Sequence, residues 1–368
     1  MGGREMTNCY VALRNGVIDA ITHHKPHHGT VLDLGELDLV PGVIDLHSDG
    51  LNTRRHPRPG TDFPMEAVLL HADTEAISNG VTTQCFCVTI DEDLAGSADL
   101  VDPLHWLGIL EQHRLRLRTD SYLHARFELS STLSALPQGL LNNRATLIAS
   151  YMVHAPGVGQ YAHDQAAWRE RYLRLDPNTP TSKENLASER CARAADTFAS
   201  RSRVADAALK AGITLASHDD VTPRDTIEAA RVGASIAEFP LTMEAATHAR
   251  SMGLGVVLGA PNAWQGRSHL AWLSARTAVS AGVVDALVSD YLPASMLEAA
   301  YCLVREGCTS WAGAMNLVTQ GPARLVGLTD RGEIAEGLVA DVAAVDLSTG
   351  TPVVRQVWRT GIPRLGLV

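Results

Sequence analysis

The sequence predicts a (β/α)8 barrel, an α/β fold, with a small β domain built from both ends of the chain. Eight short apolar runs alternate with longer stretches of helical period between residues 43 and 290, which is typical of this barrel. The segments before and after this region both have the composition of strands and turns. A hydrophobic content of 45% with only 20% charged residues indicates a chain that buries a large core.

The first β segment covers residues 8–41 and contains the dipeptide Asn15-Gly16, which favours a type I′ hairpin turn. Strand and turn composition returns after residue 332. Because chain ends often lie close together, we expect the two segments to form one small domain. The predicted boundaries are 1–42 and 326–368 for the small β domain and 43–325 for the barrel.

The eight predicted barrel strands follow one another at intervals that leave room for helices. In chain order they are VIDLH, VTTQCFCVTI, YLHARFEL, TLIASYMV, ITLASH, ASIAEF, GVVLGA and DALVSD. Stretches such as EAVLLHADTEAISNG and RDTIEAARVG separate them and have helical period. The connection from 155 to 212 is much the longest, and we expect it to form an excursion on the catalytic face of the barrel.

Charge and cysteine usage exclude several classes of partner. The 31 basic and 41 acidic side chains give a formal charge of −10, which argues against nucleic-acid and anionic membrane partners. The six cysteines are scattered, without a Cys-x-x-Cys pair. We therefore expect reduced thiols and a cytoplasmic location. A small anionic substrate remains compatible, because a bound metal or a local arginine cluster outweighs the overall charge.

Metal-binding and proton-transferring side chains end most of the predicted strands. Catalytic groups of such barrels lie at the carboxyl ends of the strands, so these side chains are candidates for one site. His47 and Asp49 lie two residues apart on a strand, point the same way and are able to chelate one ion together. The others are Glu128, His154, the triplet His218-Asp219-Asp220, Glu238 and Asp290. Imidazoles and carboxylates suit one or two Zn²⁺ or Mn²⁺ ions.

These motifs carry a resemblance to a known family. PGVIDLHSD, SNGVTT and GEIAEGLVADV resemble the amidohydrolase superfamily of metal-dependent hydrolases. LASHDD, GAPNAWQGRSH and SDYLPAS, together with HSDGLNTRRHPRPG and HAPGVGQ, resemble more narrowly the diphosphatases of the carbon-phosphorus lyase pathway of phosphonate metabolism. That resemblance covers nearly the whole chain. It implies hydrolysis of α-D-ribose 1-methylphosphonate 5-triphosphate to the 5-phosphate and pyrophosphate.

The resemblance also implies roles for individual residues. Superfamily members place metal ligands after strand one, after strand three or four and on two later histidines, with a catalytic aspartate after strand eight. Carried over to this chain, the metal ligands are His47, Asp49, Glu128, His154 and His218, and the general base is Asp290. An Asp replaces the usual second His of the first pair, which shifts the preference towards harder ions such as Mn²⁺.

The strand count departs from the pattern of the superfamily. His154 and His218 fall one strand early, so either the count is wrong or this branch rearranges its ligands, with Glu238 as a candidate substitute. Val153 also stands where many family members have an acidic residue directly before the histidine. This departure concerns either the contacts that adjust the properties of His154 or some feature of the substrate that is bound.

A triphosphate needs further cations, and the TRRHPRPG segment directly after the first strand offers Arg55 and Arg58. A solvated basic loop is the alternative, which the resemblance makes less favoured. Asn262, Arg267 and His269 follow the seventh strand and are candidates for binding phosphate or ribose, with loop-stabilising contacts as an equal alternative. The sequence contains no G-x-x-x-x-G-K-[ST] motif for binding phosphate.

Two rival functions remain open. A cyclic amidohydrolase of the hydantoinase or dihydropyrimidinase kind would use the same site to cleave a C–N bond, with less need for cations. A catalytically silent scaffold is the other, although such relatives usually lose ligands that this chain keeps. A homo-oligomer is expected by analogy with the superfamily alone.

Overall fold

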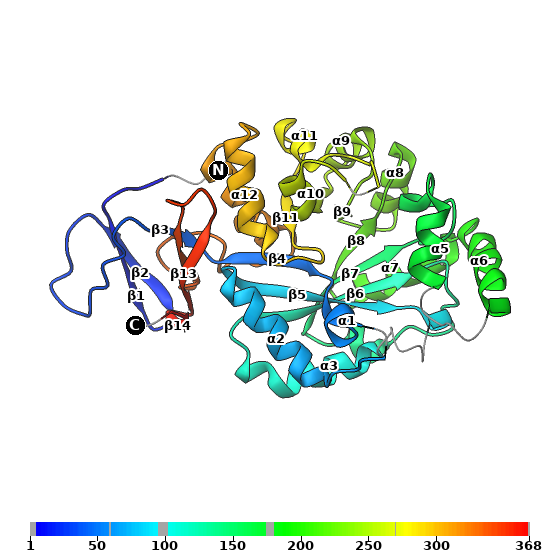
Figure 1. Ribbon diagram of the computed structural model, residues 1–368, viewed down its shortest axis with the longest axis horizontal. Helices are drawn as coiled ribbons and strands as arrows, with labels where there is room; N and C mark the ends of the chain where they lie inside the picture. Colours follow the sequence, from blue (N-terminus) through cyan, green and yellow to red (C-terminus); the bar gives the residue numbers. More distant parts are fainter. Residues whose placement is uncertain (1–4, 59, 95–101, 174–179, 269, 367–368) are drawn as a thin grey trace.

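The computed structural model describes residues 5–58, 60–94, 102–173, 180–268 and 270–366. Eight parallel strands form one sheet in sequence order, and the last strand returns to the first in a nearly closed barrel (Figure 1). Each predicted run is a strand, so the predicted fold class is confirmed. The strands are β4 (Val43–Ser48), β5 (Val81–Ile90), β6 (Asp120–Glu128), β7 (Thr146–Met152), β8 (Thr214–His218), β9 (Ile236–Glu238), β10 (Gly255–Gly259) and β11 (Ala286–Val288).

Helices surround the barrel and bury their apolar sides against the outer face of the strands. They are α1 (Leu51–Arg55), α2 (Met65–Ser78), α3 (Pro103–His113), α4 (Gln138–Leu141), α5 (Gln165–Leu173), α6 (Pro180–Ala194), α7 (Phe198–Lys210), α8 (Pro223–Arg231), α9 (Met243–Ser251), α10 (Ala260–Gln265), α11 (Ala275–Ser280), α12 (Ser295–Arg305), α13 (Trp311–Asn316) and α14 (Gln320–Leu325). A second, smaller apolar cluster fills the barrel interior, with Leu46, Cys85 and Val257 among its members.

The long connection between β7 and β8 forms α5, α6 and α7. The Trp168 indole of α5 donates a 2.8 Å hydrogen bond to the backbone carbonyl of His154, which follows β7. Arg190 of α6 is fully buried, and its guanidinium lies 2.5 Å from the carboxylate of Asp91, which follows β5. The excursion therefore packs against the carboxyl ends of the strands, as the sequence predicts.

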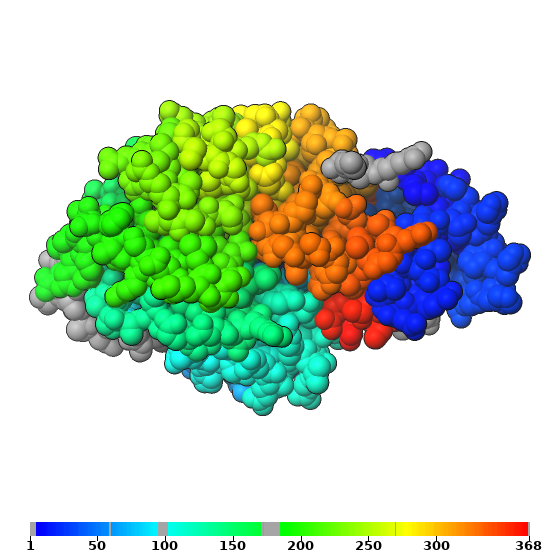
Figure 2. Space-filling view, turned by 180° about the vertical axis from the view of Figure 1, so that it is seen from behind, coloured from blue at the N-terminus to red at the C-terminus, as the bar shows by residue number. Residues whose placement is uncertain are grey.

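The small β domain combines both ends of the chain, which lie side by side at one end of the molecule (Figure 2). Its antiparallel sheet has the order β14-β13-β12-β3. Beside it, the hairpin of β1 and β2 turns at Asn15 and Gly16, whose φ angles of 51° and 85° suit the expected turn. The strands are β1 (Tyr10–Arg14), β2 (Val17–Thr22), β3 (Asp38–Pro41), β12 (Val342–Asp346), β13 (Val353–Arg359) and β14 (Ile362–Leu365). The domain boundaries after residues 42 and 325 stay predictions.

No helix in the described part of the chain is long and apolar enough to span a bilayer. All six cysteines are free thiols.

Barrel closure depends on one buried carboxylate. Asp45 of β4 accepts hydrogen bonds from the Ser289 backbone N–H at 3.0 Å and the Ser289 hydroxyl at 2.5 Å, just after β11. Two backbone hydrogen bonds continue the junction, from Asp49 to Asp290 at 2.6 Å and from Asp290 to His47 at 2.9 Å. These contacts fix the first and last strands in register, and they place His47, Asp49 and Asp290 next to one another.

Replacing Ser289 by Ala should lower the free energy of unfolding by about 1.5–3 kcal/mol, the usual contribution of a hydrogen bond to a charged group. The Asp45 carboxylate would keep its two backbone donors, the N–H groups of Ser289 and His47, and lose the hydroxyl of Ser289. Urea titration followed by circular dichroism measures the change. The control is Ser348→Ala, which removes a similar Ser-to-Asp hydrogen bond from an exposed turn and should leave the midpoint nearly unchanged. Equal effects of the two substitutions would contradict the role assigned to Asp45.

Candidate metal centre

The carboxyl ends of six barrel strands bring a dense set of imidazoles and carboxylates together. Glu128, His218 and Glu238 end β6, β8 and β9, and His47 is the last residue but one of β4. His154 and Asp290 each lie two residues beyond their strands, β7 and β11. The strand count is therefore correct, and the histidines do follow strands four and five. All six side chains are almost completely buried or lie at the mouth of the barrel.

Glu238 holds two of the imidazoles. Its Oε1 lies 2.7 Å from Nδ1 of His47, and its Oε2 lies 2.8 Å from Nδ1 of His218. Although burial opposes ionisation, the imidazoles of His47, His124 and His218 hold the pKa of Glu238 well below its usual range. The carboxylate therefore accepts a hydrogen bond from Nδ1–H of each ring and leaves Nε2 of both rings for another partner. This is the usual arrangement of a carboxylate that orients metal-binding histidines.

The first donor group consists of His47, Asp49 and Asp290, whose candidate ligand atoms lie within 4.8 Å of one another. Asp49 also accepts a 2.6 Å hydrogen bond from Nη1 of Arg126, a buried residue of β6. Burial, with a smaller effect of the Asp49 charge, raises the pKa of Asp290 above its usual value. A carboxylate in this position is a stronger proton acceptor than an exposed one.

The second donor group consists of His154, His218 and Asp219, again with ligand atoms within 4.8 Å of one another. Oδ2 of Asp219 lies 3.4 Å from Nε2 of His154 but makes no hydrogen bond in the described part of the chain. A buried carboxylate oxygen without a hydrogen-bond donor is costly unless it coordinates a cation. Two imidazoles and this carboxylate fit a divalent ion such as Zn²⁺ or Mn²⁺.

Glu128 lies in neither group, because its carboxylate is already occupied. It accepts hydrogen bonds from the backbone N–H and the hydroxyl of Ser130, at 3.0 and 2.5 Å, and from the backbone N–H of His154. Its Oε2 also lies 3.2 Å from Nδ1 of His154. These contacts favour an orienting role towards His154, like that of Glu238 towards His47 and His218, over the role of a ligand.

Three residues of the site have left-handed backbone conformations. Asp219, Phe239 and Asp290 follow β8, β9 and β11 and have φ angles of 61°, 52° and 55°. Such conformations cost roughly 1–3 kcal/mol for residues with a side chain and are concentrated at functional sites. Here they turn the chain sharply at the strand end. Asp219 and Asp290 thereby reach the donor groups of the neighbouring strands.

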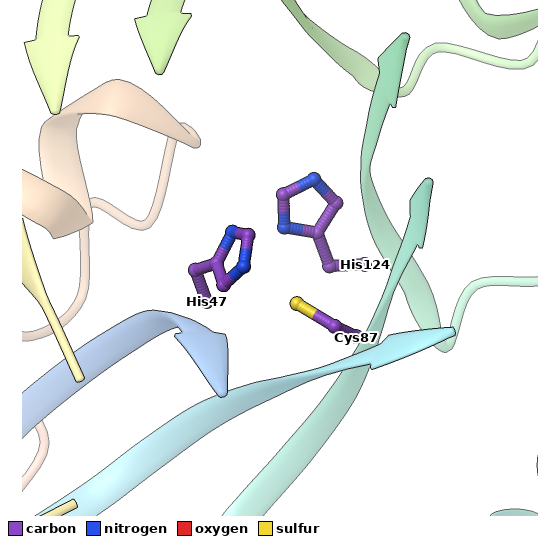
Figure 3. Close-up of side chains that lie close together, drawn as sticks. All are labelled: His47, Cys87 and His124. Atoms are coloured by element: carbon purple, nitrogen blue, oxygen red, sulfur yellow. The ribbon is translucent and has the colours of Figure 1, made fainter. Parts of the chain in front are cut away.

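A buried cluster of His47, Cys87 and His124 lies beside the first donor group, with the Cys87 sulfur directed towards both rings (Figure 3). Nδ1 of His124 donates to the backbone carbonyl of Leu46 at 3.0 Å, and its Nε2 lies 2.9 Å from the Ser150 hydroxyl. Burial lowers the pKa of His124 to about 3 and raises that of the Cys87 thiol. Because both nitrogens of His124 are engaged and the thiol stays protonated, the contacts favour interior packing for this cluster.

The four residues expected to bind substrate have different surroundings. Arg55 makes a two-pronged ion pair with Asp62 at 2.5 and 2.9 Å. Asn262 of α10 uses both ends of its amide to hold the segment that leads into α11, donating to the Leu273 carbonyl and accepting from the Ala275 backbone N–H. Arg58 and Arg267 are exposed. His269 lies outside the described residues.

Asp219 and Arg126 are the site residues that sequence reasoning did not assign. Asp219 stands in the His-Asp-Asp triplet that ends the fifth strand, but alternation along a strand does not predict the left-handed turn that brings it to the site. Arg126 lies inside the apolar run YLHARFEL, where a buried arginine is itself a signal, since charged groups are rarely buried without a partner.

The chain is similar in sequence to a protein of known activity. The chain is 32% identical over 363 residues to an α-D-ribose 1-methylphosphonate 5-triphosphate diphosphatase from Escherichia coli (strain K12), covering 97% of this chain and 96% of that protein. No family model matches the chain.

Solved structures of amidohydrolases share the fold at low identity. A 5-methylcytosine deaminase from Klebsiella pneumoniae superimposes with a TM-score of 0.65 at 15% identity, over 99% of this chain and 96% of the deaminase. An N-acetyl-D-glucosamine-6-phosphate deacetylase from Mycobacterium smegmatis gives 0.60 at 17% identity, over 96% of this chain and 94% of that enzyme. The solved structures share the fold of this chain, and the relative at 32% identity shows that the chain belongs to the family of the α-D-ribose 1-methylphosphonate 5-triphosphate diphosphatases.

Proposed function

We propose that the protein hydrolyses α-D-ribose 1-methylphosphonate 5-triphosphate to the 5-phosphate and pyrophosphate, in the cytoplasm, with one or two divalent ions at the mouth of the barrel. The 32% identity to the Escherichia coli diphosphatase along nearly the whole chain is the observation that carries this proposal. The cyclic amidohydrolase alternative has only the shared fold in its support, for example the likeness to a Brevibacillus agri dihydropyrimidinase at 14% identity.

The proposed ligands come from the two donor groups. His47, Asp49, His154 and His218 keep the role expected from the resemblance, and Asp219 joins them because of its hydrogen-bond-free oxygen. Glu128 and Glu238 act as orienting carboxylates. A divalent ion held by these residues would lower the pKa of water and offset the charge of the phosphoryl oxygens.

Asp290 is the proposed general base. Its carboxylate stands in the first donor group beside His47 and Asp49, and its backbone is fixed by hydrogen bonds to β4 on both sides of the junction. It would accept the proton of the attacking water as the bond to phosphorus forms. A rigid backbone matters here, because a general base has to remain within hydrogen-bond reach of the proton that it removes.

The triphosphate would need cations at two places. Arg126 supplies a fixed positive charge inside the centre, and Arg55 and Arg58 stand on or just after α1, which begins two residues beyond Asp49. Arg55 is free to bind phosphate only after it releases Asp62, so substrate would compete with that exposed carboxylate. Arg267 and Asn262 remain proposed contacts, with Asn262 acting chiefly through its loop.

Incubation of metal-replete protein with the ribose triphosphate substrate should release pyrophosphate and the 5-phosphate in equal amounts. The cut is expected between the α and β phosphorus atoms because pyrophosphate leaves as one unit. Phosphorus NMR of the mixture identifies both products. ATP under the same conditions reports how far the sugar end of the substrate matters. Release of orthophosphate alone, with no pyrophosphate, would contradict the proposed cut.

Replacing Asp290 by Asn should lower kcat by about 10²–10⁴-fold, the usual contribution of general base catalysis. The amide keeps the shape of the side chain but does not accept the proton. Steady-state kinetics with the substrate and elemental analysis of the same sample separate loss of base from loss of metal. An active Asn variant with its metal in place would remove Asp290 from this role.

Replacing Glu238 by Gln should weaken metal binding by about 10–100-fold, because one or both imidazoles lose the partner that orients them. Competition with a chromophoric chelator measures the affinity for Zn²⁺. Glu228→Gln is the matched control, since Glu228 pairs with Arg201 and lies in neither donor group. Unchanged affinity in the Glu238 variant would mean that the imidazoles hold their positions without it.

A further inference from the structure

The guanidinium of Arg126 lies between the two donor groups. Its Nη1 donates to Oδ2 of Asp49 in the first group at 2.6 Å, and its Nη2 lies 3.5 Å from Nε2 of His218 in the second. The side chain is only 6% exposed. Arg126 thus stands within hydrogen-bond distance of one proposed ligand in each group, Oδ2 of Asp49 and Nε2 of His218.

The charge of Arg126 is permanent in this setting. A guanidinium stays protonated at every pH at which proteins are folded, and Nη1 of Arg126 lies 2.6 Å from the Asp49 carboxylate. No accessible pH removes this positive charge from the centre.

A buried positive charge in contact with both groups bears on how many ions they hold. Two catalytic ions usually lie about 3.5–4 Å apart and share a carboxylate or water between them. In that arrangement each ion would be separated from the Arg126 guanidinium by a single ligand, Asp49 for one ion and His218 for the other. The repulsion between the guanidinium and the two ions would be strong, because little water is present to screen it. The favourable alternative is that the guanidinium replaces one of the ions.

The hydrogen bonds identify which group keeps its ion. The Asp49 carboxylate in the first group already has a cationic partner in Arg126. The Oδ2 atom of Asp219 in the second group has no hydrogen-bond donor in the described chain, and Nε2 of His154 lies 3.4 Å from it. The group of His154, His218 and Asp219 is therefore the one whose charge a metal ion would balance.

We propose that the centre binds a single divalent ion, held by His154, His218 and Asp219, and that the guanidinium of Arg126 takes the place of a second ion beside Asp49. The inference rests on the proposed metal site and specifies its stoichiometry. It narrows the ligands proposed above from both donor groups to the second group, so that His47 and Asp49 are not ligands of the bound ion. His47 and Asp290 then serve the reaction without a metal of their own, next to the Asp49–Arg126 pair.

Counting Mn²⁺ in the intact protein tests the proposal. The protein is stripped with chelator, reloaded with excess Mn²⁺, desalted and analysed for metal per chain, and its electron paramagnetic resonance spectrum is recorded. We expect one Mn²⁺ per chain with the spectrum of an isolated ion. Two ions per chain with an exchange-coupled spectrum would overturn the proposal, whatever the variants do.

Variants separate the charge of Arg126 from its bulk. Arg126→Met should admit a second, coupled Mn²⁺, whereas Arg126→Lys should keep the count at one. Arg331→Met, which removes a paired arginine that bonds Asp120 at the start of β6, is the matched control and should also stay at one. A folded Arg126→Met protein that still holds one ion would contradict the proposal.

Two further substitutions identify the group that binds the ion. Asp219→Asn should weaken Mn²⁺ binding by at least about tenfold, and Asp49→Asn should leave the count at one. The reverse pattern would overturn the assignment. These readouts need no substrate, so failure to release pyrophosphate from a protein with one bound ion would count against the proposed function alone.

Discussion

Two buried imidazoles share one carboxylate, and the rest of the centre depends on that interaction. Glu238 bonds Nδ1 of His47 and of His218 at nearly equal distances, which fixes both rings and leaves the Nε2 atom of each for a different partner. Glu128 does the same for His154 from the other side. The positions of the three candidate ligand histidines are therefore set by two carboxylates, and the positions of those carboxylates depend in turn on the register of the strands.

The barrel supplies that register. The junction between β4 and β11, built on Asp45 and Ser289, places the first donor group, and the parallel pairing of β7, β8 and β9 places the second. The left-handed residues that follow β8 and β11 then turn Asp219 and Asp290 inward. Regular strands alone would not bring consecutive residues such as His218 and Asp219 to one ion, because neighbouring side chains on a strand point to opposite faces.

Sequence reasoning predicted the eight strands and the composite β domain, because apolar runs and turn residues are local signals. It also predicted that one set of side chains lies together at the carboxyl ends of the barrel strands, namely His47, Asp49, His154, His218, Glu238 and Asp290. The sequence did not predict which of these residues are candidate ligands and which ones orient a neighbouring histidine. Whether Glu128 binds a metal or a neighbouring histidine depends on Ser130 and on the backbone of His154. The conformation of Asp219 and the reach of Arg126 across the barrel depend in the same way on tertiary geometry that no single-residue pattern encodes.

The central claim is that these side chains hold a divalent cation at the barrel mouth. Crystals of the protein grown with Zn²⁺ and measured on both sides of the zinc absorption edge test it most directly. The account predicts an anomalous peak about 2.0–2.1 Å from Nε2 of both His154 and His218, with Asp219 completing the set. A fully loaded crystal with no peak among these residues, or with zinc bound only at surface histidines, would contradict it.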